Sequence, residues 1–249
     1  MDTVQDASGQ PFAGWLEGEL ARYYEPAAVL RRSDRKEILL YRHRESGQHI
    51  VYRRIRGRQP VYDSLCLFRS RNIAEVYETT FDGRDTLVIE EYVDGVTIAD
   101  VLEKRLFTVK EMCGTIIQLC EGLHALHERH IIHRDIKPDN VMIQNDGVVK
   151  LIDFDSSKIF KPSVERDTTT LGTVGYAAPE QYGEAQSDER TDIYALGILM
   201  NVMLTGVHPV KMQARGRTGK LIEKCIMVNP GKRCENVLEI RKALKKIAD

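Results

Sequence analysis

The chain has 249 residues, of which 42% are hydrophobic and 29% charged, and its formal net charge is −1. This length can bury the core of one large domain or of two small ones, and the near-zero charge gives no global indication of a nucleic-acid or membrane partner. No apolar run reaches the roughly 18 residues that span a bilayer, and the N-terminus lacks a signal-peptide pattern. Five scattered cysteines fit a reducing compartment better than a disulfide framework, so we expect a cytoplasmic protein.

The N-terminal region, residues 1–23, divides into a tail and a helix. Residues 1–11 are polar and contain Gly and Pro, which is typical of a loose tail. From Phe12 to Tyr24 the apolar residues recur near helical spacing, at Phe12, Trp15, Leu16, Leu20 and Tyr23. We expect a short amphipathic helix that packs on the segment following it.

Residues 24–94 show strand patterns. Apolar and β-branched residues cluster at 28–30, 38–41, 50–52, 77–80 and 86–89. Glu45–Gln48 and Asp82–Gly83 are turn sequences between neighbouring clusters. The pattern predicts an antiparallel sheet of about five strands, which ends at Asp94-Gly95.

The charge of this region is uneven. Residues 31–58 contain ten Lys or Arg residues against three acids, a net charge of +7. Such a segment can form the solvated faces of twisted strands or an anion-binding surface, and the sequence leaves both interpretations open.

The remainder, 95–249, is mainly helical by pattern. The longest predicted helix runs from Val109 to His127, and its apolar residues Ile116, Leu119, Cys120, Leu123 and Leu126 lie close to one face. A second apolar helix is predicted from Thr191 to Leu204. Residues 220–247 supply two more, which are interrupted at Asn229-Pro230-Gly231.

Three motifs in this half point to chemistry. His133–Asn140 (HRDIKPDN) contains an acid, a cation two residues later and an amide three residues after that. Asp153-Phe154-Asp155 and Ala178-Pro179-Glu180 follow. An acid that orients a hydroxyl, a cation beside a phosphate and oxygen ligands for magnesium are the parts that phosphoryl transfer needs.

With these motifs the chain resembles the eukaryotic-type protein kinase family, most closely its bacterial serine/threonine branch, from about Tyr24 to the C-terminus. The resemblance implies an α+β fold of two lobes, a small antiparallel N-lobe at 24–94 and a mainly helical C-lobe at 95–249. It also implies a serine/threonine kinase that uses ATP and Mg²⁺ on a protein substrate with a Ser or Thr acceptor. Nucleic acid is not an expected partner.

The family assigns roles to the matching residues. Asp135 is expected to orient the attacking hydroxyl and accept its proton, and Lys137 to neutralise charge on the transferred phosphate. Asn140 and Asp153 are the expected Mg²⁺ ligands. The expected nucleotide contacts are Ile38, Val51, Arg53, Glu91, Val93 and Met142.

Other residues are expected to support the site. The resemblance implies that Thr173 bonds Asp135 and Lys137, that Glu180 pairs with Arg233, and that Asp192 braces the catalytic-loop backbone. It also suggests a regulatory phosphosite among Thr168–Thr170 that pairs with Arg134. The four histidines spaced three residues apart are expected to pack rather than to bind metal: His124, His127, His130 and His133.

The first lobe departs from the family. Charged or polar residues replace all three glycines of the phosphate loop (Arg31, Ser33 and Lys36), Arg53 replaces a lysine, and Asp155 replaces a glycine. The basic residues therefore have two interpretations: they bind phosphate through their side chains, or they block the pocket. Since only a short helix fits before residue 71, we predict that Glu90 pairs with Arg53, with Asp63 as the fallback partner.

Three functions follow from these observations. The first is an active, compact and slow serine/threonine kinase, because the residues for transfer and metal binding are intact. The second is a nucleotide-binding pseudokinase or scaffold, which the altered phosphate loop and Arg53 favour. The third takes the basic segment as a binding surface for an anionic partner such as RNA.

Overall fold

The computed structural model describes residues 12–160, 173, 175–182 and 186–248. The described residues within 1–69 and 74–93 form one compact unit, and those within 70–73 and 94–249 form the other. The chain passes from the first unit to the second next to the predicted lobe boundary. The domain limits 1–23, 24–94 and 95–249 themselves stay predictions.

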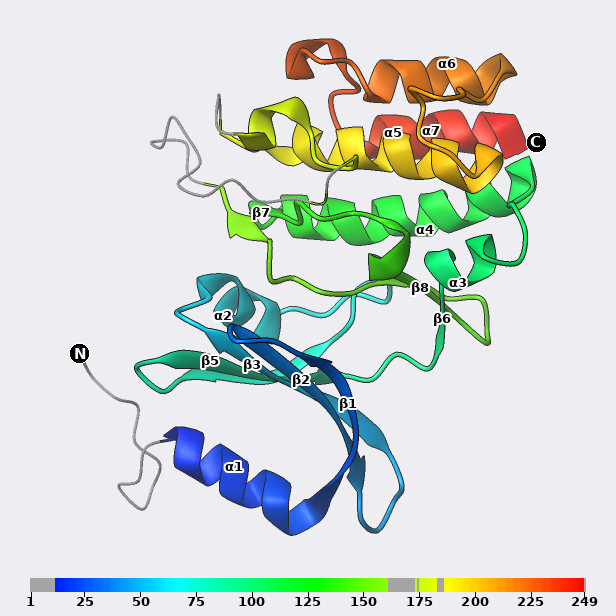
Figure 1. Cartoon of the computed structure of the whole chain (residues 1–249). Helices are drawn as coiled ribbons and strands as arrows, with labels where there is room; N and C mark the ends of the chain where they lie inside the picture. The colour runs from blue at the N-terminus through cyan, green and yellow to red at the C-terminus, as the bar shows by residue number, and fades with distance from the viewer. Residues whose placement is uncertain (1–11, 161–172, 174, 183–185, 249) are drawn as a thin grey trace. The chain divides into compact units, whose positions relative to one another are not determined.

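The first unit is built on a five-stranded antiparallel sheet (Figure 1). Its strands are β1 (Tyr24–Arg32), β2 (Lys36–His43), β3 (His49–Arg56), β4 (Val76–Phe81) and β5 (Asp85–Glu91), in the order β1-β2-β3-β5-β4. Each strand pairs antiparallel with its neighbours. The predicted sheet is confirmed, and with it the α+β fold.

Helix α1 (Phe12–Tyr23) covers one face of this sheet. Leu16 and Leu20 are buried against Ile50, Tyr52 and Leu87. Because side chains alternate along a strand, the residues between these positions on β3 and β5 face the other side of the sheet. The expected packing of the N-terminal helix is confirmed. One face of the sheet is therefore covered by α1, and we call it the α1 face.

Helix α2 (Pro60–Cys66) is short, as the spacing predicted. Pro60 stands in its first turn, where the missing N–H has no helical partner to lose. Its buried side chains are Val61, Tyr62 and Leu65. The helix adjoins β4, where the Cys66 thiol donates to the Tyr77 carbonyl at 3.4 Å.

The second unit is a stack of helices (Figure 1). They are α3 (Ile98–Leu102), α4 (Val109–His127), α5 (Glu189–Thr205), α6 (Gly216–Cys225) and α7 (Val237–Ala248). Helix α4 packs on α5 and α7, and α6 packs on the same two helices. In the described part of the chain, no helix has both the length and the apolar character needed to cross a membrane.

Short strands and single turns place the motifs on this helical stack. The strands are β6 (Gly95–Thr97), β7 (Ile131–Ile132), β8 (Val141–Gln144), β9 (Val149–Leu151) and β10 (Lys158–Ile159), and the 3₁₀ turns are η1 (Pro138–Asn140), η2 (Pro179–Tyr182) and η3 (Pro230–Lys232). They form a sheet β6-β8-β9 and a pair β10-β7. The run His133–Asn140 thus connects β7 to β8, and Asp153 follows β9.

Candidate active site

The loop between β7 and β8 and the segment after β9 each contain a residue with an uncommon backbone conformation. Arg134 has φ 69° and Asp153 has φ 64°, which places both in the left-handed region. Non-glycine residues rarely adopt this conformation, and strain of this kind is concentrated at functional sites. Asp155, at the glycine position of the family, is not among the described residues with positive φ.

Asp135 is the centre of a small polar cluster. Its Oδ2 accepts from Lys137 Nζ at 2.9 Å and from Asn140 Nδ2 at 3.0 Å, and its Oδ1 accepts from Thr173 Oγ1 at 2.7 Å. Lys137 Nζ also donates to Thr173 Oγ1 at 2.8 Å. The expected contacts of Thr173 are therefore confirmed, and Thr173, which is 38 residues away in the sequence, meets Lys137 and Asn140 at the Asp135 carboxylate.

This cluster keeps Asp135 ionised. Partial burial opposes the charged form, but the hydrogen bonds from Thr173 and Lys137 outweigh it, so the pKa of Asp135 lies below its ordinary value. An ionised carboxylate with two oriented oxygens is suited to hold a hydroxyl group and accept its proton.

Asn140 and Asp153 have the chemistry of hard-cation ligands. Asn140 donates through Nδ2 to the Asp135 carbonyl at 2.8 Å, which leaves its amide oxygen to act as a ligand. The Ile152 N–H donates to the Asn140 carbonyl at 3.0 Å and so ties the segment before Asp153 to the loop. Among the described residues, no three His, Cys, Asp or Glu side chains converge on a metal position. A magnesium ion on these two residues would therefore take further oxygens from phosphate or water.

Asp192, at the start of α5, braces the loop as expected. Its carboxylate accepts from the backbone N–H of His133 at 2.9 Å and of Arg134 at 2.8 Å, and contacts His127 Nε2 at 2.8 Å. Burial disfavours its charge, yet the hydrogen bond from His127, the nearby His133 ring and the Arg134 N–H hold the pKa of Asp192 below its ordinary value.

Of the four histidines, His127 and His133 are buried, His124 is half-buried and His130 is exposed. His133 is fully buried, with its ring edge-on to Phe154 at 5.2 Å between centroids. Burial lowers the pKa of His133 below its usual value. His124 lies 3.5 Å from Glu128 on the same helix, and His127 is engaged by Asp192.

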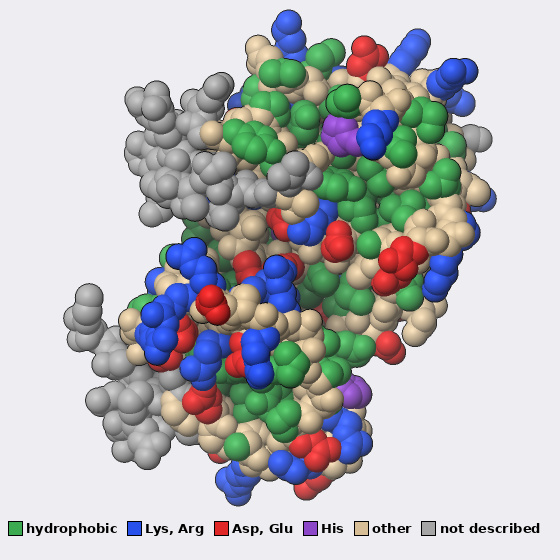
Figure 2. All heavy atoms as spheres, viewed as in Figure 1, with side chains coloured by type: hydrophobic (Ala, Val, Ile, Leu, Met, Phe, Trp, Pro, Cys, Tyr) green, Lys and Arg blue, Asp and Glu red, His purple; other side chains and the backbone are tan. Residues whose placement is uncertain are grey.

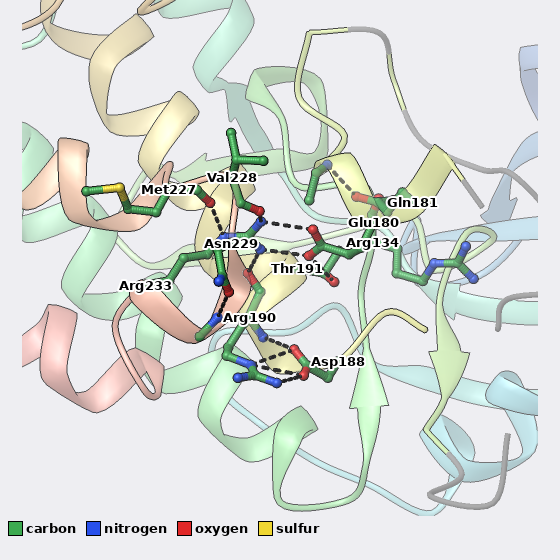
Figure 3. A network of polar contacts seen from close by, with 12 residues as sticks. Arg134, Glu180, Gln181, Asp188, Arg190, Thr191, Met227, Val228, Asn229 and Arg233 are labelled. Atoms are coloured by element: carbon green, nitrogen blue, oxygen red, sulfur yellow. Dashed lines mark hydrogen bonds and ion pairs between the residues drawn. The ribbon is translucent and has the colours of Figure 1, made fainter. Parts of the chain in front are cut away.

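The Glu180–Arg233 pair links η2 to the segment after η3 (Figure 3). Arg233 Nη1 and Nη2 donate to the two oxygens of Glu180 at 2.7 and 2.9 Å, so the pair is bidentate. Arg233 also donates to three backbone carbonyls, those of Met227, Val228 and Arg190. The predicted pair is confirmed, and the buried guanidinium joins three segments.

Two polar residues of the site escaped sequence reasoning. Gln181 donates to the Arg134 carbonyl at 2.8 Å and accepts from the Ala178 N–H at 2.9 Å, which couples η2 to the catalytic loop (Figure 3). Asn72 donates to the Val149 carbonyl at 2.8 Å, beside β9. The position of Gln181 directly after Glu180 was a signal for the first; no local pattern marks the second.

In the first unit, Arg53 and Glu90 form the predicted pair. Arg53 Nε donates to Glu90 Oε1 at 2.6 Å, and the side chains are only 5% and 4% exposed. Asp63, the fallback partner, instead contacts Arg58. A buried arginine thus stands at the phosphate-lysine position, held by a carboxylate from β5.

The other predicted nucleotide residues have defined places within their own units. Ile38, Val51 and Arg53 share the sheet face opposite α1, since Ile38 pairs with Arg53 across β2 and β3. Val93 is buried, and the Glu91 N–H donates to the Glu75 carbonyl at 2.8 Å. Met142 lies on β8 of the second unit, half-buried. Nucleotide binding by these six residues stays a prediction.

The last two predictions concern the phosphate loop and the regulatory phosphosite. The phosphate-loop position is a tight hairpin in which Ser33 N–H donates to the Lys36 carbonyl at 2.8 Å. Arg32 forms an ion pair with Glu37 across it. The predicted phosphosite at Thr168–Thr170 lies outside the described residues.

Most of the sequence is similar to that of known protein kinases. A protein kinase domain model matches residues 62–247. Serine/threonine-protein kinase PknL of Mycobacterium tuberculosis is 33% identical over 148 residues, which are 59% of this chain and 37% of that protein. An Aurora kinase of Candida glabrata is 35% identical over 155 residues, 62% of this chain and 43% of that one.

A probable serine/threonine-protein kinase PknB of Corynebacterium glutamicum is 40% identical over 126 residues, 49% of this chain and 20% of that protein. The matched stretch is thus less than half the length of each of these relatives. Since the domain model spans most of the sequence, including every residue of the Asp135 cluster, the chain belongs to the protein kinase family.

Proposed function

We propose that the chain is a serine/threonine protein kinase that transfers the γ-phosphate of magnesium-bound ATP to a hydroxyl of a protein substrate. The observation that carries this proposal is the Asp135 carboxylate, held ionised by Lys137 and Thr173. Membership of the family supports it, as do the relatives named serine/threonine-protein kinases.

In this proposal each loop residue has one task. Asp135 orients the substrate hydroxyl and takes its proton, while Lys137 Nζ neutralises charge on the phosphate oxygens. Thr173 fixes the orientation of both side chains. Magnesium, when bound with ATP, neutralises the phosphates, and Asn140 and Asp153 are the residues that would hold it.

The nucleotide side of the proposal rests on six residues. Ile38 and Val51 in the first unit, and Met142 in the second, would contact the adenine ring. The Glu91 carbonyl and the Val93 N–H would bond its edge. Arg53 would offer charge to the phosphates, although it is already engaged by Glu90.

The test compares three proteins with labelled ATP, magnesium and a basic protein acceptor. The wild-type chain should transfer label, and Asp135→Asn should lower the rate by about 10²–10⁴-fold because it removes the proton acceptor. Asp153→Asn should lower it through loss of magnesium. Equal labelling by all three would overturn the proposal.

A second function has its own supporting observation. The buried Arg53–Glu90 pair and the charged hairpin in place of a glycine loop favour a nucleotide-binding pseudokinase or scaffold. In that case magnesium-ATP raises the melting temperature, but no label is transferred by the wild-type chain. Measuring both label transfer and the melting temperature with magnesium-ATP therefore distinguishes the kinase from the pseudokinase.

A further inference from the structure

A hollow in the first unit is lined almost entirely by charged residues. It has a volume of about 330 Å³ and lies between the β1–β2 turn, the end of β3 and the β4–β5 turn. Its cationic lining residues are Arg32, Arg35, Lys36, Arg54, Arg56 and Arg84. We call it the basic hollow. Figure 2 shows Lys and Arg side chains gathered, with fewer acids among them, over the sheet-bearing unit.

Cations outnumber acids in this lining. Six Lys or Arg residues face three acids, Asp34, Glu37 and Asp85, which leaves a net charge of +3. Asp85 has three guanidinium groups within 4.0 Å, those of Arg54, Arg56 and Arg84. The Asp85 carboxylate is thus shared by three arginines, so the electrostatic potential in the hollow remains positive.

The backbone holds the three segments of the basic hollow together. The Arg56 N–H donates to the Arg35 carbonyl at 2.8 Å, which joins the end of β3 to the β1–β2 turn. The Gly57 N–H donates to the Arg84 carbonyl at 2.9 Å, which joins it to the β4–β5 turn. The cations are therefore brought together before any ligand arrives, which lowers the entropy lost on binding.

The basic hollow is separate from the predicted nucleotide residues of this unit. Side chains alternate along β3, so Arg54 and Arg56 face the α1 side while Val51 and Arg53 face the other. The contact of Arg54 with Glu17 of α1 confirms this orientation. Lys36, which pairs with Ile55, lies by the same alternation on the other face, but the charge that Arg54 and Arg56 bring to the hollow is unexplained by the proposed phosphotransfer.

The lining also indicates the kind of anion. Arginine forks bind phosphate oxygens in pairs, and clusters of them recognise phosphorylated protein segments. Single-stranded nucleic acid, by contrast, is bound on basic grooves that also offer aromatic rings for base stacking. None of the ten lining residues, all of them described, is aromatic.

We propose that the basic hollow binds a phosphorylated side chain of a protein partner. The site is independent of phosphotransfer, so it can exist in an active kinase and in a pseudokinase alike. In this proposal the β1–β2 hairpin contributes to phosphate binding on the α1 face of the sheet.

The test uses fluorescence anisotropy with a labelled peptide that carries one phosphoserine, and with its unphosphorylated twin. At physiological salt the phosphopeptide should bind at least about tenfold more tightly, a difference of the order that one charge-assisted bond supplies. Excess inorganic phosphate should compete with it. A labelled single-stranded oligonucleotide is measured in parallel.

Matched variants locate the binding. Arg56→Glu and the milder Arg84→Gln, which changes a side chain that is 71% exposed, should each weaken phosphopeptide binding. The control is Arg44→Glu in the β2–β3 turn, at the opposite end of the sheet, which should leave binding within about twofold. Melting curves verify that each variant is folded.

The outcomes are decisive in both directions. Binding that requires the phosphate and is lost in the hollow variants but not in the control supports the proposal. Equal binding of both peptides, or equal weakening by Arg44→Glu and Arg56→Glu, overturns it. Tighter binding of the oligonucleotide than of the phosphopeptide also overturns it, in favour of a nucleic-acid surface.

Discussion

At the scale of single residues, the Arg53–Glu90 pair is the most consequential departure from the family pattern. Both side chains are removed from water, so removing one ion of the pair is costly. Glu90→Ala should lower the free energy of unfolding by about 3–5 kcal/mol, because it leaves a buried charge without its carboxylate. Denaturant unfolding of wild type and variant measures the loss.

Two further variants test whether the loss of stability in Glu90→Ala is due to the unpaired charge. The double variant Arg53→Met with Glu90→Leu should recover most of the stability, because an apolar pair of similar volume avoids the desolvation of both ions. Asp63→Ala breaks the exposed pair with Arg58 and should cost less than about 1 kcal/mol. A double variant as unstable as Glu90→Ala would show that packing, not charge, explains the effect.

The buried Asp192 gives stability a defined dependence on pH. Its pKa is lower in the folded than in the unfolded chain, so its contribution is present above the unfolded pKa of about 3.9 and is lost as pH falls through the folded pKa. Asp192→Asn should therefore cost about 1.5–3 kcal/mol at neutral pH, the range for hydrogen bonds to a charged group.

The difference in free energy of unfolding between wild type and Asp192→Asn should narrow as the pH falls below about 4. Protonation of Asp192 then removes from the wild type the charge that the variant lacks. Urea unfolding at several pH values checks it, with the exposed Asp94→Asn as a control that stays level with wild type. A gap between wild type and Asp192→Asn that is the same at neutral and acid pH would contradict the assignment of charge to Asp192.

Residue contacts could be predicted from the sequence only where a motif fixes them. The contacts of Thr173, Glu180 and Asp192 follow from the motif positions, and the structure confirms them. Asn72 bonds a carbonyl 77 residues away, which no local spacing encodes. Polar networks of this kind arise from tertiary placement and are invisible to pattern analysis.

At the scale of elements, the start of α4 is fixed by a capping box. Thr108 Oγ1 accepts from the Glu111 N–H at 3.2 Å, and Glu111 accepts from the Thr108 N–H at 2.8 Å. Thr108→Ala should lower the free energy of unfolding by about 1 kcal/mol, since two N–H groups of the first turn depend on this exchange. Thermal and urea unfolding both report it.

Lys110→Ala, in the same exposed turn, is the matched control and should stay within about 0.5 kcal/mol of wild type. Thr108→Ser keeps the hydroxyl and should keep most of the stability. If Thr108→Ala and Thr108→Ser were equally unstable, the methyl group rather than the cap would be responsible.

Strong local signals explain which elements could be predicted. Helix α4 begins and ends where the apolar spacing indicated, at Val109 and His127. Helix α6 begins at Gly216, earlier than the predicted 220, because Gly216 and Gly219 are poor helix formers that hide its first turn. Tertiary packing, which buries Leu221, Ile222 and Cys225, overrides that local preference.

At the scale of the whole molecule, divergence from the family is concentrated in one stretch. The family model begins at residue 62, after the hairpin with the basic hollow, and then covers the chain to residue 247. The catalytic cluster and its braces lie within that range, whereas the altered phosphate loop precedes it. The part of the chain that the family model matches thus contains the Asp135 cluster, and the charged hairpin lies in the part that precedes it.

The basic segment at 31–58 makes the charge distribution of the molecule asymmetric, which the overall composition conceals. Residues 31–58 hold +7, and since the whole chain carries −1, the remainder carries −8. We therefore expect the protein to be retained on a cation-exchange column at neutral pH and low salt, although its net charge is negative. A column responds to the field of a surface region rather than to the total charge.

Two pairs of variants distinguish retention by overall surface charge from phosphopeptide binding in the basic hollow. Replacing Arg42 and Arg44 with Glu should lower the salt needed for elution about as much as replacing Arg56 and Arg84, because a resin senses charge at a distance of about one Debye length, roughly 10 Å at 0.1 M salt. Phosphopeptide binding should distinguish the two pairs, since only Arg56 and Arg84 line the basic hollow. Flow-through of the wild type at low salt would show that the acids elsewhere in the molecule screen the basic segment.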